Sequence, residues 1–247
     1  MKKRILIGAP VRQDHLTFYK YLKALNQLDT DGVHVDFFFI LHNSPRLKRF
    51  LNPNQLMEFT SQHDYKRDEI MHHWSNNNLN DVVFMKNLLI DKTIQGNYTH
   101  FFLVDSDIIL ESDTLKRLLS HDKSIVSQCF WTSWTPNSEP MPNAWMGDFY
   151  SFIYEGHWHE WHNAGLYEVG GSGACILIHS QVFYDGVNYS PIKNVSFSNW
   201  EDRAFSIRAH CAGHSIFMDT TNPPIHLYRQ KEVRPSKNKM KQAHQTK

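Results

Sequence analysis

The chain has 247 residues and a formal net charge of +1, and this length fits one large α/β domain better than two independent domains. No apolar run reaches the ~20 residues that a membrane-spanning helix needs. The three cysteines are scattered and form no Cys-x-x-Cys pair, which argues against a structural zinc site and a disulfide framework. We therefore expect a cytoplasmic protein, with peripheral contact to a membrane surface left open.

Strand and helix patterns alternate along the sequence. Apolar runs predict strands at residues 4–9, 34–41, 101–104, 124–130, 175–178 and 215–219. Apolar residues at helical spacing predict helices at 16–28, 80–95, 114–120 and 202–212, and Ser112 or Asp113 is expected to cap the third of these. This order predicts an α/β fold with a mainly parallel central sheet flanked by helices, and a small antiparallel or irregular second half.

Polar residues follow three of the predicted strands. Pro10, Val11 and Arg12 follow the first strand, and Asn43 follows the second. The motif Asp105-Ser106-Asp107 follows the apolar run at 101–104. Ligands of parallel α/β sheets bind at the carboxyl ends of the strands, so these three segments predict one site. No Gly-x-Gly-x-x-Gly or P-loop motif follows a strand, which argues against a dinucleotide site and a P-loop.

The two carboxylates of Asp105 and Asp107 are the most informative pair in the sequence. Burying unpaired charges at the end of an apolar strand is costly, and a divalent cation with oxygen ligands would offset that cost. Residues i and i+2 of a strand point the same way, so we expect both carboxylates to face one site.

The segment 131–161 contains five of the seven tryptophans, together with Pro, His and Asn. Long irregular segments in compact domains are often binding loops, and aromatic rings suit the faces of sugars or bases. The alternative is that these tryptophans fill a second small core. The histidines at 157–162 lack a third ligand at suitable spacing, so no metal site is expected there.

Three further features lie in the second half. Gly170, Gly171 and Gly173 allow either a close approach to a ligand or a tight turn. Glu201 and Asp202 begin a predicted helix, where acidic residues suit the helix dipole but can also act as a general base. His226 is a structural residue or, beside an acidic site, a metal ligand.

The last segment, 229–247, has seven Lys/Arg and one Glu, which leaves 19 Lys/Arg and 24 Asp/Glu in the first 228 residues. Such a charged, polar stretch is typical of a solvated tail. Contact with an anionic lipid surface, with nucleic acid or with a diphosphate is the alternative.

Taken in order, these motifs resemble the GT-A fold of nucleotide-sugar glycosyltransferases, close to family 2. The matching pieces are residues 9–12, Asp105-Ser106-Asp107, 170–174, 200–202 and His226, and the resemblance covers residues 4 to 228. It implies a Rossmann-like GT-A domain at 1–228, with a nucleotide-binding half at 4–125 and an acceptor-binding half at 126–228. The basic tail at 229–247 would be a lid or disordered.

The resemblance also implies roles for individual residues. Asp107 and His226 would bind Mn²⁺ or Mg²⁺, and Asp105 would join them or contact the donor ribose or sugar. Asp202 would be the general base, with Glu201 as the second candidate. The remaining expected contacts to the donor are Pro10, Val11, Arg12, Asn43, Lys86, Ser106, Gly171, Ser172, Gly173 and Arg229.

The function implied by the resemblance is metal-dependent transfer of one sugar, from a UDP-sugar in the first instance, to an acceptor hydroxyl with inversion. The chain lacks the Gln-x-x-Arg-Trp motif of processive synthases, which favours transfer of a single sugar. The acceptor would be a carbohydrate, a glycolipid or, as in phage-type DNA glycosylation, a modified nucleobase. A nucleotidyltransferase and a non-catalytic sugar- or nucleic-acid-binding module stay open as alternatives.

Overall fold

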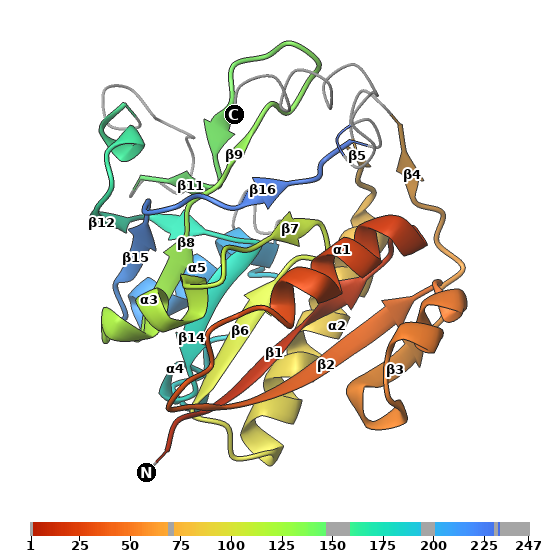
Figure 1. Cartoon of the computed structure of the whole chain (residues 1–247), viewed down its shortest axis with the longest axis horizontal. Helices are drawn as coiled ribbons and strands as arrows, with labels where there is room; N and C mark the ends of the chain where they lie inside the picture. The colour runs from red at the N-terminus through yellow and green to blue at the C-terminus, as the bar shows by residue number, and fades with distance from the viewer. Residues whose placement is uncertain (1, 69–71, 147–158, 194–200, 230–231, 233–247) are drawn as a thin grey trace, which may run out of the picture.

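A twisted eight-stranded sheet forms the framework of the protein (Figure 1). The computed structural model describes residues 2–68, 72–146, 159–193, 201–229 and 232. The strand order is β12-β15-β8-β14-β6-β1-β2-β3. β1 pairs parallel with β2 and β6, β2 with β3, and β8 with β15, whereas β14 runs antiparallel to both of its neighbours and β12 antiparallel to β15. The predicted α/β fold with a mainly parallel central sheet is confirmed.

α-Helices and three short 3₁₀ segments connect the strands. They are α1 (His15–Leu25), η1 (Pro45–Phe50), η2 (Pro53–Gln55), α2 (Asn76–Gln95), α3 (Thr114–Ser120), η3 (Glu160–His162), α4 (Gln181–Tyr184) and α5 (Glu201–Cys211).

The strands of the central sheet are β1 (Arg4–Val11), β2 (His34–His42), β3 (Leu56–Phe59), β6 (His100–Val104), β8 (Ile125–Gln128), β12 (Leu166–Val169), β14 (Cys175–His179) and β15 (Ile216–Asp219). Short two-stranded ribbons are formed by β4 (Lys66–Arg67) with β5 (His72–His73), β7 (Ile108–Ile109) with β16 (Ile225–His226), β9 (Trp131–Thr132) with β10 (Met141–Pro142), and β11 (Ala144–Trp145) with β13 (Gly171–Ser172).

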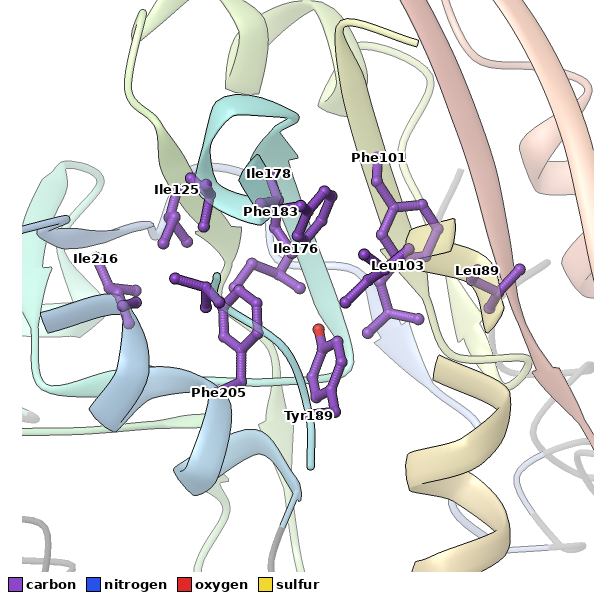
Figure 2. Close-up of a cluster of buried hydrophobic side chains, with 14 of the residues drawn as sticks. Leu89, Phe101, Leu103, Ile125, Ile176, Ile178, Phe183, Tyr189, Phe205 and Ile216 are labelled. Carbon is purple, nitrogen blue, oxygen red and sulfur yellow. The ribbon is translucent and has the colours of Figure 1, made fainter. Parts of the chain in front are cut away.

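Alternation along the strands divides the core between the two faces of the sheet. On β6, Phe101 and Leu103 pack with α2, α4 and α5, while Phe102 and Val104 pack with α1 and α3. Figure 2 shows the first of these clusters, in which Phe205 of α5 lies beside Tyr189 and the β14 side chains. Each fully buried apolar side chain of this size contributes roughly 1.5–3 kcal/mol, so both layers of helices hold the sheet.

At the N-terminal ends of α2 and α3 the structure differs from what the sequence predicted. α2 begins at Asn76 rather than at 80, because Ser75 and Asn78 form a reciprocal capping box that lacks the usual Glu or Gln at its third position. α3 spans 114–120 as predicted, but the Asp113 side chain makes no capping hydrogen bond. Its carboxylate pairs with Arg117 instead.

A buried ion pair ties α3 to the sheet. Asp219, which is fully buried at the end of β15, accepts hydrogen bonds from Arg117 (2.8 Å) and is 2.9 Å from His121 Nε2. Burial alone would raise the pKa of Asp219, but its bonds with His121 and the Thr221 backbone, and the charge of Arg117, lower it below its usual range. This carboxylate therefore has a structural role.

Among the described residues, no helix has both the length and the apolar character that crossing a bilayer requires.

Candidate functional site

One cavity of about 660 Å³ lies where β1, β2 and β6 end. The carboxyl ends of these parallel strands meet at one edge of the sheet (Figure 1), which is where ligands of such sheets bind. The side chains that line it come from segments far apart in the sequence. The predicted site residues among them are Pro10, Val11, Arg12, Lys86, Asp105, Ser106, Asp107, Gly173, Glu201, Asp202 and His226.

The two carboxylates of the Asp105-Ser106-Asp107 motif face different partners. β6 ends at Val104 and the chain then turns, with Ile108 donating its N–H to the Asp105 carbonyl at 3.0 Å. Both carboxylates line the same cavity, but the motif lies in a turn, so the alternation of a strand is not what places them there. Asp107 lies beside Gln13 and His226, whereas Asp105 is close enough to Lys86 for their charges to interact.

Asp107 and His226 are brought together by the β7–β16 ribbon. His226 pairs with Ile108 across the ribbon, and Leu227 donates its N–H to the Asp107 carbonyl at 2.8 Å. As a result, His226 Nε2 lies 3.6 Å from Asp107 Oδ1, and both side chains are nine-tenths buried. The other histidine nitrogen, Nδ1, is 2.7 Å from Thr132 Oγ1.

The chemistry of this pair fits a divalent cation. When Nδ1 donates its proton to Thr132, the lone pair of Nε2 is left for a metal, as in many metal sites. Gln13 donates to Asp107 Oδ2 at 3.1 Å, and Oδ1 is the oxygen that lies 3.6 Å from His226 Nε2. The 3.6 Å between His226 Nε2 and Asp107 Oδ1 is less than the summed length of two metal–ligand bonds of ~2.1 Å, so both atoms could bind one ion. No group of three or more His, Cys, Asp or Glu residues suited to a metal exists in the described part of the chain, so ligand oxygens and water would complete the shell.

Lys86 and two acids also line this cavity. Lys86 Nζ lies 2.8 Å from Asp202 Oδ1 and 3.0 Å from Glu201 Oε1. Lys86 is only 2% exposed, and its burial alone would lower its pKa. The carboxylates of Asp202, Glu201 and Asp105 outweigh this effect and raise the pKa well above its usual value, so the lysine is charged.

Asp105 and Asp202 hold their protons more tightly than they would in water. Burial raises the pKa of Asp105 to about 8, with Lys86 opposing and the neighbouring carboxylates adding to the rise. Burial also raises the pKa of Asp202, again against the effect of Lys86. The Asp202 side chain is 27% exposed and that of Glu201 13%, so Asp202 is the better placed of the two to exchange a proton with a ligand.

The glycine-rich segment makes room for protein side chains rather than for a sharp turn. A Cβ on Gly173 would collide with the Asp202 carboxylate, and a Cβ on Gly171 would collide with the Trp145 indole. Neither glycine has positive φ; the left-handed residue is Ala174, with φ 66°. The Asp105 N–H donates to the carbonyl of Ala174 at 2.7 Å. This hydrogen bond joins the glycine-rich segment to the turn that contains Asp105 and Asp107.

Four predicted donor contacts are not among the residues that line the cavity. Asn43 bonds to the backbone of Ser61 through both atoms of its amide. Ser172 bonds to Asn143, and Gly171 is covered by Trp145. Arg229 is 2% exposed, donates to the Ser133 carbonyl and pairs with Glu232. Residues 147–158 and most of the basic tail, 230–231 and 233–247, lie outside the described residues.

Aromatic side chains absent from the predicted site form one wall of the cavity. Ring centroids are 5.1 Å apart for Trp74 and Tyr65, 4.3 Å for His72 and Tyr228, and 5.4 Å for Tyr228 and Trp134. Trp74 and Trp134 are 46% and 44% exposed. All five line the cavity. The tryptophans of the segment 131–161 thus have two different roles. Trp145 and Trp161 are buried, whereas Trp134 is exposed and lines the cavity.

Asn78, a polar residue of the cavity that is not among the predicted site residues, could have been found from the helical spacing of α2. Asn78, Val82 and Lys86 follow one another at intervals of four residues along α2, and all three line the cavity. The interval of four places them on one face of the helix. The predicted start at residue 80 excluded Asn78; recognition of the cap at Ser75 would have included it.

Comparisons with known proteins agree with the fold. No family model matches the sequence, and no curated protein is similar to it. Among solved structures, CMP:2-keto-3-deoxy-manno-octonic acid synthetase complexed with CTP has a TM-score of 0.52 at 12% identity, covering 98% of this chain and 99% of that one. S. aureus TarS has a TM-score of 0.49 at 11% identity, covering 91% of this chain but 36% of TarS. At these identities the first likeness shows the fold alone.

Proposed function

We propose that this protein is a metal-dependent transferase that moves a sugar from a nucleotide sugar to an acceptor hydroxyl, with inversion at the sugar. The observation that carries the proposal is the pairing of Asp107 with His226 in the same cavity as the Lys86–Asp202 pair. The first pair would hold a cation and the Asp202 carboxylate would accept a proton, and sugar transfer from a diphosphate needs both.

In this proposal, Asp107 and His226 hold Mn²⁺ or Mg²⁺, which neutralises the charge on the leaving diphosphate when bound. Asp105 lies on the other side of the turn and contacts the donor ribose or sugar. Pro10, Val11 and Arg12 line the side of the cavity that would hold the nucleotide. UDP is the first donor nucleotide to test because of the resemblance in motifs, and cytidine nucleotides follow because the synthetase of similar fold was solved with CTP.

Asp202 would accept the proton of the acceptor hydroxyl, whose oxygen then bonds to the sugar as the nucleoside diphosphate leaves. Carbohydrates and glycolipids are the first acceptor classes to test, because the first 228 residues carry more acidic than basic side chains and phosphate backbones bind through basic ones. A modified nucleobase in DNA is a further acceptor to test, with the basic tail as the proposed DNA contact.

A donor screen tests the proposal. The protein is incubated with UDP-, GDP-, CMP- and TDP-sugars and Mn²⁺, and release of the nucleotide is measured with and without EDTA. We expect metal-dependent turnover of one donor that Asp107→Ala abolishes and Asp36→Ala, a substitution at a half-exposed acid far from the cavity, leaves unchanged. If no nucleotide sugar binds, with or without metal, the proposal is wrong.

A nucleotidyltransferase is the second candidate, favoured by the fold that this chain shares with the synthetase over nearly the whole of both chains. Such an enzyme joins a nucleoside triphosphate to a sugar and releases pyrophosphate. Incubation with each nucleoside triphosphate and a panel of sugars and sugar phosphates distinguishes the two. Pyrophosphate release would favour this candidate, whereas release of a nucleoside diphosphate from a nucleotide sugar favours the first.

A further inference from the structure

Lys86 lines the cavity but is almost completely buried. It is 2% exposed, and its ammonium is held between Asp202, Glu201 and the ring of Tyr189, whose centroid lies 4.9 Å from Nζ. Lysines that bind phosphate from solvent are point charges on flexible stems. A lysine with its charge already paired inside the protein acts on its partners instead.

The partner most affected is Asp202. Its Oδ1 accepts the hydrogen bond from Lys86 at 2.8 Å, and its Oδ2 lies against the backbone of Gly173, in the space where any other residue would place a Cβ. The carboxylate is therefore held from two sides by α2 and by the segment before β14. It still lines the cavity and is 27% exposed, so it is oriented without being sealed off.

The negative charges around the Asp202 carboxylate explain why it needs the positive charge of Lys86 to stay ionised. The ionisable groups that face Lys86 are Asp202 and Glu201 from α5, Asp105 from the turn after β6, and Tyr189 from the segment before α5. Asp202 itself interacts with Lys86, Glu201, Asp105 and Tyr189. Three carboxylates share one buried lysine, and burial together with the neighbouring negative charges raises the pKa of Asp105 and of Asp202.

We propose that Lys86 is the positioning residue of the Asp202 carboxylate, fixing its orientation toward the cavity and keeping it ionised near neutral pH. The role in turnover rests on the proposed function. There, the acceptor O–H bond breaks, its proton passes to Asp202, the oxygen bonds to the sugar, and the bond between the sugar and the diphosphate breaks. The effect of Lys86 on the charge of Asp202 does not depend on which reaction takes place.

The first test measures that charge directly. Carboxyl ¹³C NMR titrations of the full chain, with the Asp202 signal assigned by its loss in Asp202→Asn, are compared between wild type and Lys86→Met. We expect the pKa of Asp202 to rise by at least ~1 unit in Lys86→Met, because an opposite charge at this range shifts a carboxyl by ~1–3 units. Lys86→Arg keeps the cation, so its shift should stay within ~0.5 unit.

The matched control is Lys92→Met, which removes a lysine from the same helix at a site whose ammonium lies 4.0 Å from the ring centroid of Phe38. It should leave the Asp202 titration unchanged. Circular dichroism melts report whether each variant folds; if Lys86→Met does not, Lys86→Gln, which is neutral but still donates hydrogen bonds, replaces it. An unchanged Asp202 titration in a folded neutral variant overturns the proposal.

The second test uses turnover of the donor found in the screen. Lys86→Met should lower kcat by ~10²-fold or more, as loss of a general base does. It should change the donor KM by less than ~3-fold and move the acid limb of the pH–rate profile upward, while Lys86→Arg recovers most of the rate. Equal losses in Lys86→Met and Lys86→Arg with no movement of the acid limb indicate a merely structural lysine. If the wild type turns over no donor, the proposed function fails, and the titration still decides the role of Lys86.

Discussion

His226 Nε2 lies 3.6 Å from Asp107 Oδ1, although the two residues come from opposite halves of the chain. The β7–β16 ribbon sets this distance, since His226 pairs with Ile108, the residue after Asp107. A two-residue ribbon beside the main sheet thus brings together the two residues that we propose bind the cation. A slip of one residue in its register would turn His226 to the other face.

Removing either member of this pair should abolish metal-dependent binding of the donor. For Asp107→Ala and His226→Ala we expect the affinity for a nucleotide in Mn²⁺ to fall to that measured in EDTA. Turnover should drop by on the order of 10²–10³-fold, because the metal supplies several kcal/mol at the transition state. Isothermal titration calorimetry measures the binding. His34→Ala, at an exposed histidine, is the control, and full Mn²⁺ dependence in both site variants would rule out this cation pair.

Asp202 and Glu201 should respond differently to neutral replacements. Asp202→Asn should keep the donor KM and lower kcat by ~10²–10⁴-fold, the usual contribution of a general base. Glu201→Gln should lower kcat less, because the Glu201 side chain is less exposed to the cavity. Steady-state kinetics at saturating donor measure both. The reverse order of losses would assign the proton transfer to Glu201.

Gly173→Ala should damage catalysis without removing nucleotide binding. The new Cβ would collide with the Asp202 carboxylate and push it from its position beside Lys86, while Asp107 and His226 stay in place. We expect a fall in kcat of at least ~10-fold, because a small misplacement of a catalytic group is costly. The Mn²⁺-dependent affinity for nucleotide should be unchanged. A variant with wild-type kcat would show that the Asp202 position tolerates this displacement.

The exposed rings of Trp74 and Trp134 should contribute to acceptor binding. Both line the cavity with exposed faces, and an aromatic contact of this kind contributes ~0.5–1.5 kcal/mol. Trp74→Ala and Trp134→Ala should therefore raise the acceptor KM by ~2–10-fold. Hydrolysis of the donor in the absence of acceptor should not change. Tyr184→Ala removes a more exposed ring outside the cavity and is the control; if it has the same effect on the acceptor KM, the rings in the cavity have no special role.

The Arg117–Asp219 pair should make stability depend on pH at the acid end. The fold lowers the pKa of Asp219, so its contribution is present above the unfolded pKa of ~3.9 and is lost as pH falls through the lower folded value. Asp219→Asn should cost roughly 1.5–3 kcal/mol at pH 7, because it removes a charged hydrogen-bond acceptor of Arg117 while the pair with Asp113 remains. Urea unfolding measures the difference, which should shrink below about pH 4; a constant difference down to pH 3 contradicts the ion-pair explanation.

Much of the fold was predictable from local patterns. The apolar run before Asp105 predicted β6, and the helical spacing at 114–120 predicted α3 to the residue. The antiparallel insertion of β14 between β6 and β8 was not predictable, since its apolar sequence suits either direction. The stretch at 46–71 gave no pattern because its strands and 3₁₀ segments are only two to six residues long.

The candidate site was predictable in its residue types but not in its pairings. By itself the sequence determined that acids, glycines and a histidine follow the ends of predicted elements, because strand and helix periods are encoded within a dozen neighbouring residues. Only the tertiary structure decided that Asp107 meets His226, that Lys86 turns inward to Asp202, and that Asn43 and Arg229 bond elsewhere. The physical reason is that these contacts join residues far apart in the chain, and the packing of whole elements sets their geometry.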